Sequence, residues 1–237
     1  MQWEIQLAGP SEDLKALEES MSASNIRIFS RNSQFFLEWD GFEHLKLPEE
    51  VFDSAKNLLQ MLTGAARIAI GMRKPIEVAH IARYRPDGKQ DSFSYVREIA
   101  FIRDSATISL TARDGSNLIV RPADPVPKWI DLALADSTVA KALRLVGFGI
   151  DDWVSLYRLF EVIVDNVGGI ENIDKRGWVG KVTLKRFKHT ANSPGTVGDD
   201  SRHGTEHTEL PKKPIELTDA KAMVNLLLHE WLREKMP

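Results

Sequence analysis

The chain contains no cysteine among its 237 residues. This absence excludes a disulfide framework and any metal site that is built on thiolates. A chain without cysteine is typical of a reducing compartment, and we therefore expect a cytoplasmic location.

Long hydrophobic runs and an excess of basic residues are also missing. No apolar stretch reaches the roughly 18 residues that a membrane-spanning helix needs, so we expect no membrane partner. The first residues lack a basic segment followed by an apolar one, which predicts that there is no secretory signal. Because 31 Lys and Arg stand against 34 Asp and Glu, the formal net charge is −3. Any nucleic-acid site must therefore depend on a local basic patch.

What the chain does have is enough apolar material for a core, since hydrophobic residues make up 43% of it. In the N-terminal half, polar and apolar residues alternate over residues 2–7, which is typical of a half-buried strand. Residues 26–29 and 35–39 are rich in apolar and aromatic residues and predict two further strands. A turn is expected at residues 31–33. Two helices are expected after Pro10 and from Leu47, and the second has a stripe at helical spacing made of Val51, Ala55, Leu58, Leu59 and Leu62. Strand patterns return over residues 76–120, so an antiparallel sheet with two helices is predicted.

A proline-rich joint at Pro122, Pro125 and Pro127 marks the expected domain boundary. We place an N-terminal α+β domain at residues 1–124 and an all-helical domain at residues 125–237. In the second, helices are predicted over residues 129–146 with a break near Asp136, from Asp152 to Gly168, over residues 178–191, and from about Thr218. The fold class is therefore α+β.

The polar residues that carry chemistry gather in an irregular segment between the last two predicted helices. His189, His203 and His207 lie there, together with Arg186 and Arg202. Connections of about twenty residues between helices are longer than usual, and they are often functional or else disordered. An arginine and a histidine can serve phosphodiester cleavage, because the imidazole moves a proton and the guanidinium stabilises charge on the phosphoryl oxygens. Such chemistry requires neither a metal nor a cofactor.

Residues 202–207 resemble the Arg-x(4–6)-His motif of the HEPN superfamily, in which a polar residue often follows the arginine, as His203 does here. The wider stretch 128–235 also resembles a group of bacterial proteins that includes accessory proteins of methylamine utilisation. HEPN modules are small helical bundles, often dimeric, and many cleave RNA. The resemblance therefore implies a C-terminal HEPN-like bundle, a homodimer and RNA as partner.

The same resemblance implies roles for several of the site residues. His207 would be the acid or base, with His203 beside it, and Arg202 would bind the phosphate. From the residues themselves, Arg186, Lys188, His189 and Asn192 are candidates for binding the anionic substrate, because they form a basic helix end. Glu161 and Asp165 would orient the catalytic groups, and Glu161, at the edge of an apolar stripe, would need a cation.

Plainer interpretations stand beside these. Residues 186–192 also fit an ordinary helix C-terminus, where cations favour the dipole and Asn192 can take a left-handed conformation. His203 and His207 have the spacing of zinc ligands on a helix, but Gly204 interrupts any helix there. The glycines near residue 198 follow no strand, which argues against a nucleotide loop.

Two hypotheses about function follow. The first is a HEPN-like, metal-independent RNA-binding or RNA-cleaving homodimer. The second is an accessory protein without catalysis, in which the segment 189–207 is structural and the N-terminal domain recruits a protein partner.

Overall fold

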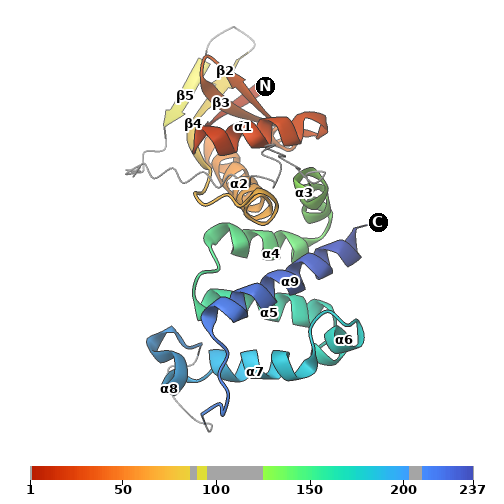
Figure 1. Ribbon diagram of the computed structural model, residues 1–237. Coiled ribbons are helices and arrows are strands. Elements are labelled where there is room, and N and C mark those ends of the chain that lie inside the picture. Colours follow the sequence, from red (N-terminus) through yellow and green to blue (C-terminus); the bar gives the residue numbers. More distant parts are fainter. Residues whose placement is uncertain (1, 86–89, 95–124, 203–209, 237) are drawn as a thin grey trace, which may run out of the picture. The chain divides into compact units, whose positions relative to one another are not determined.

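The computed structural model describes residues 2–85, 90–94, 125–202 and 210–236 (Figure 1). By its internal contacts the chain divides into two compact units. Unit 1 comprises Met1–Ala55 and Glu77–Pro125, and unit 2 comprises Lys56–Ile76 and Val126–Pro237. The boundary expected after residue 124 stays a prediction, but residues 56–76 group with the C-terminal helices rather than with the sheet.

Unit 1 contains the predicted antiparallel sheet. Its strands run in the order β2-β3-β1-β4-β5, and all pairs are antiparallel. Ile5 pairs with Leu37 on one side and with Ile81 on the other, and all three are buried. The strand bounds are β1 Gln2–Ala8, β2 Ile26–Arg31, β3 Gln34–Trp39, β4 Glu77–Tyr84 and β5 Gln90–Ser94.

The predicted turn between the second and third strands is confirmed. Asn32 and Ser33 have φ values of 52° and 62°. Positive φ at both central residues suits the right-handed twist of a two-residue hairpin, and asparagine tolerates this region better than most residues. The register that follows places Arg31 opposite Gln34.

Helix α1 (Ser11–Ser20) buries Leu14 and Leu17, and helix α2 (Pro48–Ile70) begins where the sequence predicts. The Glu50 carboxylate accepts hydrogen bonds from the backbone N–H groups of Lys46 and Leu47 at 3.2 and 3.1 Å. Every member of the predicted stripe of α2 is buried: Val51, Ala55, Leu58, Leu59 and Leu62. The α2 helix belongs to unit 1 up to residue 55 and to unit 2 from residue 56.

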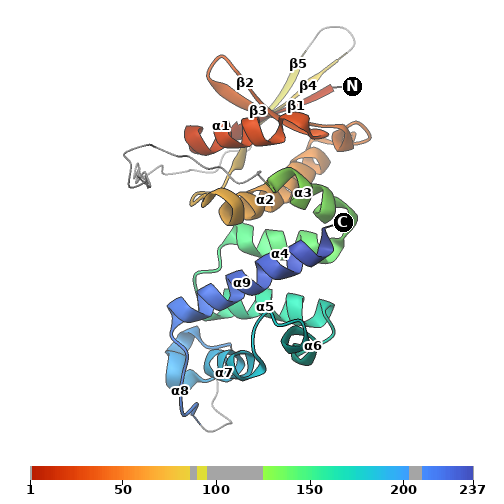
Figure 2. The same cartoon turned by 45° about the vertical axis from the view of Figure 1, so that its right-hand side comes forward.

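The described part of unit 2 is helical, which together with the sheet confirms the α+β class. Helix α5 lies between α4 and α7, and α9 runs along it (Figures 1 and 2). Besides residues 56–70 of α2, its helices are α3 Val126–Ala135, α4 Ser137–Phe148, α5 Trp153–Asn166, α6 Ile170–Lys175, α7 Lys181–Ala191, α8 Pro194–Val197 and α9 Leu217–Lys235.

Two elements depart from the sequence prediction. The helix expected from residue 178 begins at Lys181, and α6 precedes it. The connection predicted to be irregular contains the short helices α8 and Gly198–Asp200. These pieces are too short for a periodic apolar pattern, so sequence periodicity could not reveal them.

Helices α2 and α4 approach so closely that only glycine fits at the crossing. A Cβ on Gly64 would lie 1.9 Å from the carbonyl oxygen of Leu143, and a Cβ on Gly147 would lie 2.2 Å from that of Gln60. Both contacts are with backbone, which cannot rotate away as a side chain can. This crossing explains why residues 56–76 pack with the helices of unit 2.

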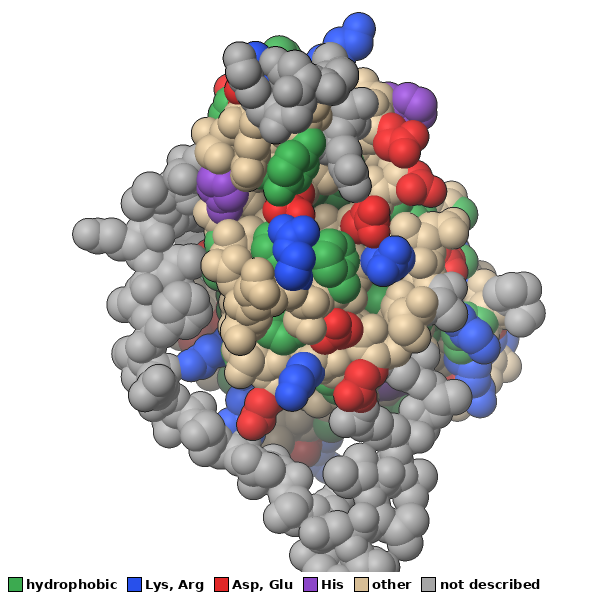
Figure 3. Space-filling view, turned by 90° about the horizontal axis from the view of Figure 1, so that it is seen from above, with side chains coloured by type: hydrophobic (Ala, Val, Ile, Leu, Met, Phe, Trp, Pro, Cys, Tyr) green, Lys and Arg blue, Asp and Glu red, His purple; other side chains and the backbone are tan. Residues whose placement is uncertain are grey.

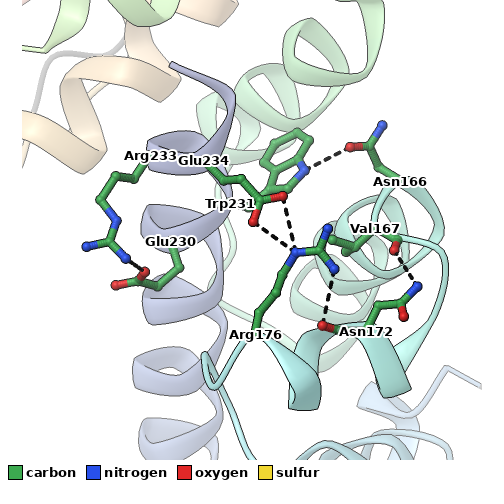
Figure 4. A network of polar contacts seen from close by, with 8 residues as sticks. All are labelled: Asn166, Val167, Asn172, Arg176, Glu230, Trp231, Arg233 and Glu234. Carbon is green, nitrogen blue, oxygen red and sulfur yellow. Dashed lines mark hydrogen bonds and ion pairs between the residues drawn. The ribbon is translucent and has the colours of Figure 1, made fainter. Parts of the chain in front are cut away.

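A polar network joins the ends of α5, α6 and α9 (Figure 4). The indole Nε1 of Trp231 donates to Asn166 Oδ1 at 2.9 Å. Arg176 Nε donates to the Glu234 carboxylate at 2.9 Å, and Arg176 Nη1 donates to the carbonyl of Asn172 at 3.2 Å. The network therefore fixes α9 on the bundle that carries the candidate site.

The face of unit 1 seen in Figure 3 carries hydrophobic side chains with charges of both signs around them. Unit 1 also contains an aromatic cluster, independent of this view, in which Phe29 stacks on Phe36, with ring centroids 5.6 Å apart, and the Arg31 guanidinium lies 4.6 Å from the centroid of the Phe36 ring. Arg31 is also paired with Glu4 at 2.6 Å. The charge of Arg31 in this cluster is therefore balanced by that of Glu4. Among the described helices of both units, none combines the length and the apolarity of a membrane span.

Candidate functional site

The predicted site residues that the structure describes gather around the middle of α5 and the last turns of α7. The backbone N–H of Arg202 donates to the carbonyl of Ala191 at 3.0 Å. The backbone N–H of Ile215 donates to Thr190 Oγ1 at 3.1 Å. The end of α7 therefore anchors the chain on both sides of the segment that carries the two predicted catalytic histidines. His203 and His207 themselves lie outside the described residues.

Helix α5 starts at Trp153 because Asp152 caps it, in agreement with the helix predicted from Asp152. The Asp152 carboxylate accepts from the backbone N–H and the hydroxyl of Ser155 at 2.8 and 2.7 Å. Partial burial raises the pKa of Asp152, but these hydrogen bonds and the charge of Arg158 outweigh burial and leave that pKa below its ordinary value. The far end of α5 is closed by Gly168 and Gly169, which have φ values of 80° and 109°.

Arg202 is paired with Glu161, one of the two carboxylates that were predicted to orient the catalytic groups. Its Nη2 lies 2.9 Å from Glu161 Oε1, and its guanidinium carbon lies 4.6 Å from the centroid of the Tyr157 ring. The Arg202 side chain is 37% exposed and that of Glu161 is 45% exposed. The guanidinium is therefore positioned by two contacts from α5 and still reaches solvent.

Arg186, predicted to bind substrate, contacts the chain instead. Its Nε donates to the carbonyl of Lys213 at 2.7 Å and its Nη2 to that of Pro214 at 2.6 Å. These bonds secure the segment that leads into α9. Here the helix-terminus interpretation describes the contacts of Arg186 better than an anion-binding role does.

Asn192 ends α7 and connects it to α5. Its Nδ2 donates to Tyr157 Oη at 3.3 Å and to the carbonyl of Lys188 at 2.8 Å. Its Oδ1 is buried and has no hydrogen-bond partner among the described residues. The backbone of Asn192 has a φ of −97°, so it does not adopt the left-handed conformation that the sequence allowed. Lys188 and His189 are exposed on the same last turns.

An open groove of about 750 Å³ runs along α5 beside the Arg202–Glu161 pair. Glu161 and Asp165, the two predicted orienting residues, line it, and so does Lys188 from α7. Two further cations, Lys141 of α4 and Arg158 of α5, also line it. Among the residues that the structure describes, none of the three cations forms an ion pair.

Lys141 and Arg158 were not among the site residues predicted from the sequence. Arg158 could have been found, because it lies on the same face of α5 as Glu161 and Asp165, three and seven residues before them. Lys141 comes from a different helix, and nothing in its local sequence distinguishes it from a solvated lysine. Only the packing of α4 on α5 brings it to the groove.

Within the described ranges, His, Asp and Glu residues form no group of three that could hold a metal ion. Comparisons with known protein families, with curated proteins and with solved structures find no match.

Proposed function

We propose that unit 2 is a HEPN-like RNA-binding module whose groove along α5 receives the phosphate backbone of RNA. The observation that carries this proposal is the set of cations in the groove, Lys141, Arg158 and Lys188, which form no ion pair within the described residues. Two carboxylates, Glu161 and Asp165, line the groove. The charge of Glu161 is already balanced by Arg202, so only that of Asp165 opposes the three cations. A concave surface with a positive balance attracts phosphates even on a chain with net negative charge.

The position of Arg202 suggests how a phosphate would be held at the groove's edge. Its guanidinium has five N–H donors, and the ion pair with Glu161 does not use all of them. A phosphate oxygen beside Tyr157 could accept the others. In the stronger form of the proposal, His207 transfers a proton to or from the ribose hydroxyl or the leaving oxygen while Arg202 stabilises the phosphoryl charge.

Reversing two of the groove's charges tests RNA binding. We expect Lys141→Glu/Lys188→Glu to weaken the binding of a single-stranded RNA by at least about tenfold and to flatten its salt dependence, because two phosphate contacts are lost. Lys128→Glu/Lys175→Glu has the same net charge, and its substitutions lie at exposed positions outside the groove. This control should bind like the wild type in fluorescence anisotropy at matched salt. Equal losses in both variants would contradict the proposal.

Cleavage is assayed separately on the same RNAs without added metal. The stronger form predicts products with the wild type and none with Arg202→Ala or His207→Ala. If the wild type binds RNA but does not cleave it, the proposal of RNA binding stands and that of catalysis is rejected.

The contacts of Arg202 also favour the second hypothesis, an accessory protein in which this segment is structural. Both partners of the ion pair are more than a third exposed, so the pair and the stacking on Tyr157 together are worth only about 1 kcal/mol. We expect Arg202→Ala to lower the free energy of unfolding by about that amount in urea denaturation. Arg202→Lys keeps the charge but loses the planar stacking, so its free energy of unfolding should lie between those of the wild type and Arg202→Ala.

The second hypothesis gains if Arg202→Ala lowers stability while the wild type binds no RNA. The homodimer, the protein partner of the N-terminal half and the cytoplasmic location remain parts of the proposal. Sedimentation of the full chain tests the dimer.

A further inference from the structure

A second cavity in unit 2 shares no lining residue with the groove along α5. It has a volume of about 540 Å³ and is formed by the end of α2 and the turn after it, the end of α4, and α9. Small-molecule sites commonly have volumes of roughly 300–1,000 Å³. The cavity is therefore large enough for a small organic ligand.

The floor of this cavity is apolar. Met72 and Val146 line it and are only 4% and 3% exposed, and Ile68 and Ile150 complete the apolar lining. Met72 and Val146 expose almost no surface, so a ligand with a hydrocarbon body would cover mainly the half-buried side chains of Ile68 and Ile150.

The rim of the cavity is cationic, and one of its cations is held in place. Arg67 Nη1 donates to the carbonyl of Val146 and Arg67 Nη2 to that of Arg73, each at 3.2 Å. Its Nε is buried and has no hydrogen-bond partner among the described residues. Because a guanidinium has five N–H donors, Arg67 is an ordered cation with donors unused. Arg73 adds a second positive charge at the rim.

The backbone that carries Arg73 is itself fixed. Besides the bond from Arg67, the N–H of Ile76 donates to the buried Thr63 Oγ1 at 3.3 Å. The one carboxylate in the described lining, Asp151, is paired with Lys221 at 3.0 Å. The site therefore has a net positive charge above an apolar floor.

We propose that this cavity binds a small amphipathic carboxylate. The carboxylate would lie at the rim between Arg67 and Arg73, with Asn225 and His229 as further polar neighbours. The hydrocarbon body would lie against Ile68 and Ile150. The carboxylate would contact the cationic part of the lining, and the hydrocarbon body would contact the apolar part. A ligand with only one of these groups would contact only one part of the lining.

Octanoate is the probe, with octanol and inorganic phosphate as its two halves, and titration calorimetry is the measurement. We expect saturable binding of octanoate that is at least about tenfold tighter than that of either half, since octanol lacks the charge-assisted hydrogen bonds and phosphate lacks the apolar contact. Arg73→Glu reverses an exposed charge and leaves the backbone contacts in place, so it should fold normally. It should weaken octanoate binding by at least about tenfold. Asn225→Asp, which keeps the side-chain shape and adds a negative charge at the rim, should also weaken it.

Lys175→Glu is the control, because it makes the same charge change at an exposed position outside the cavity. If octanol bound as tightly as octanoate, the proposed role of the carboxylate would be contradicted. If phosphate bound as tightly as octanoate, the proposed role of the apolar body would be contradicted. Absence of saturable octanoate binding, or identical affinities for Arg73→Glu and Lys175→Glu, would remove the site. None of these outcomes depends on whether the groove along α5 binds RNA.

Discussion

At the scale of single residues, Asp136 performs two tasks in unit 2. Its carboxylate caps α4 by accepting from the N–H of Thr138 at 2.8 Å, and it pairs with Lys235 of α9 at 2.6 Å. The hydrogen bond from Lys235 lowers the pKa of Asp136, partial burial opposes this, and the N–H groups of the cap lower the pKa further. The net result is a pKa below the ordinary value, so folding favours the ionised form.

Two substitutions separate these tasks. Asp136→Ala loses both and should lower the free energy of unfolding by about 1–2 kcal/mol at neutral pH. Asp136→Asn keeps a good cap and should cost less than about 1 kcal/mol. A carboxylate with a lowered folded pKa stabilises the protein above its unfolded pKa of about 3.9, and this contribution disappears as the pH falls through the folded pKa. The difference between wild type and Asp136→Asn in urea denaturation should therefore shrink below about pH 4. A difference that stays constant into strong acid would contradict this account.

The sequence predicted one long-range contact of an arginine and missed another. Glu161 was expected to need a cation, and Arg202 supplies it. The bonds of Arg186 to the carbonyls of Lys213 and Pro214 were not foreseen, because they depend on where a distant segment returns to α7. An arginine in a sequence does not reveal whether its partner is a ligand or a backbone carbonyl.

At the scale of helices, the crossing of α2 and α4 depends on two glycines. Alanine favours a helix over glycine by about 1 kcal/mol, but its Cβ at Gly64 would meet a carbonyl oxygen at 1.9 Å. The helices would have to separate, and overpacking of this kind costs about 1–3 kcal/mol and sometimes more. We therefore expect Gly64→Ala and Gly147→Ala each to lower the melting temperature of the protein.

The two substitutions should not be additive. Once one alanine has separated the helices, the second meets less resistance, so the double variant should lose less stability than the sum of the two single losses. Gly180→Ala is the control, because Gly180 has no atom within 4 Å of its added Cβ and a φ of −64°. If both interface variants melted like this control, close packing at the crossing would be refuted.

The apolar periodicity of the sequence predicted the long helices but not the contacts between them. The stripe on α2 was read correctly because it repeats along the helix, and all its members are buried. Gly64 and Gly147 gave no signal, since glycine inside a helical pattern looks like a weakness rather than a contact. The physical reason is that a packing surface defined by missing side chains is visible only when both helices are present.

At the scale of the whole molecule, this contact bears on where a foldable unit begins. The proline-rich joint suggests that residues 125–237 form a domain, but the contacts place Lys56–Ile76 in the same unit. Without residues 56–76, α4 would expose the surface around Leu143 and Gly147, and Arg67 could not donate to the carbonyl of Val146. Apolar surface that loses its partner lowers stability in proportion to the area exposed.

We therefore expect the fragment 125–237 to unfold at a lower temperature than unit 2 does in the full chain, with a broader transition in circular dichroism. A peptide of residues 48–76 added in trans should raise the melting temperature in a saturable way, because whatever binds the folded state stabilises it. The same peptide with Gly64→Ala is the matched control and should not, since its Cβ would collide with the backbone of α4. A fragment that melts as sharply and at the same temperature as the full chain, with or without peptide, would show that the proline joint alone defines the domain and that the glycine crossing contributes nothing to its fold.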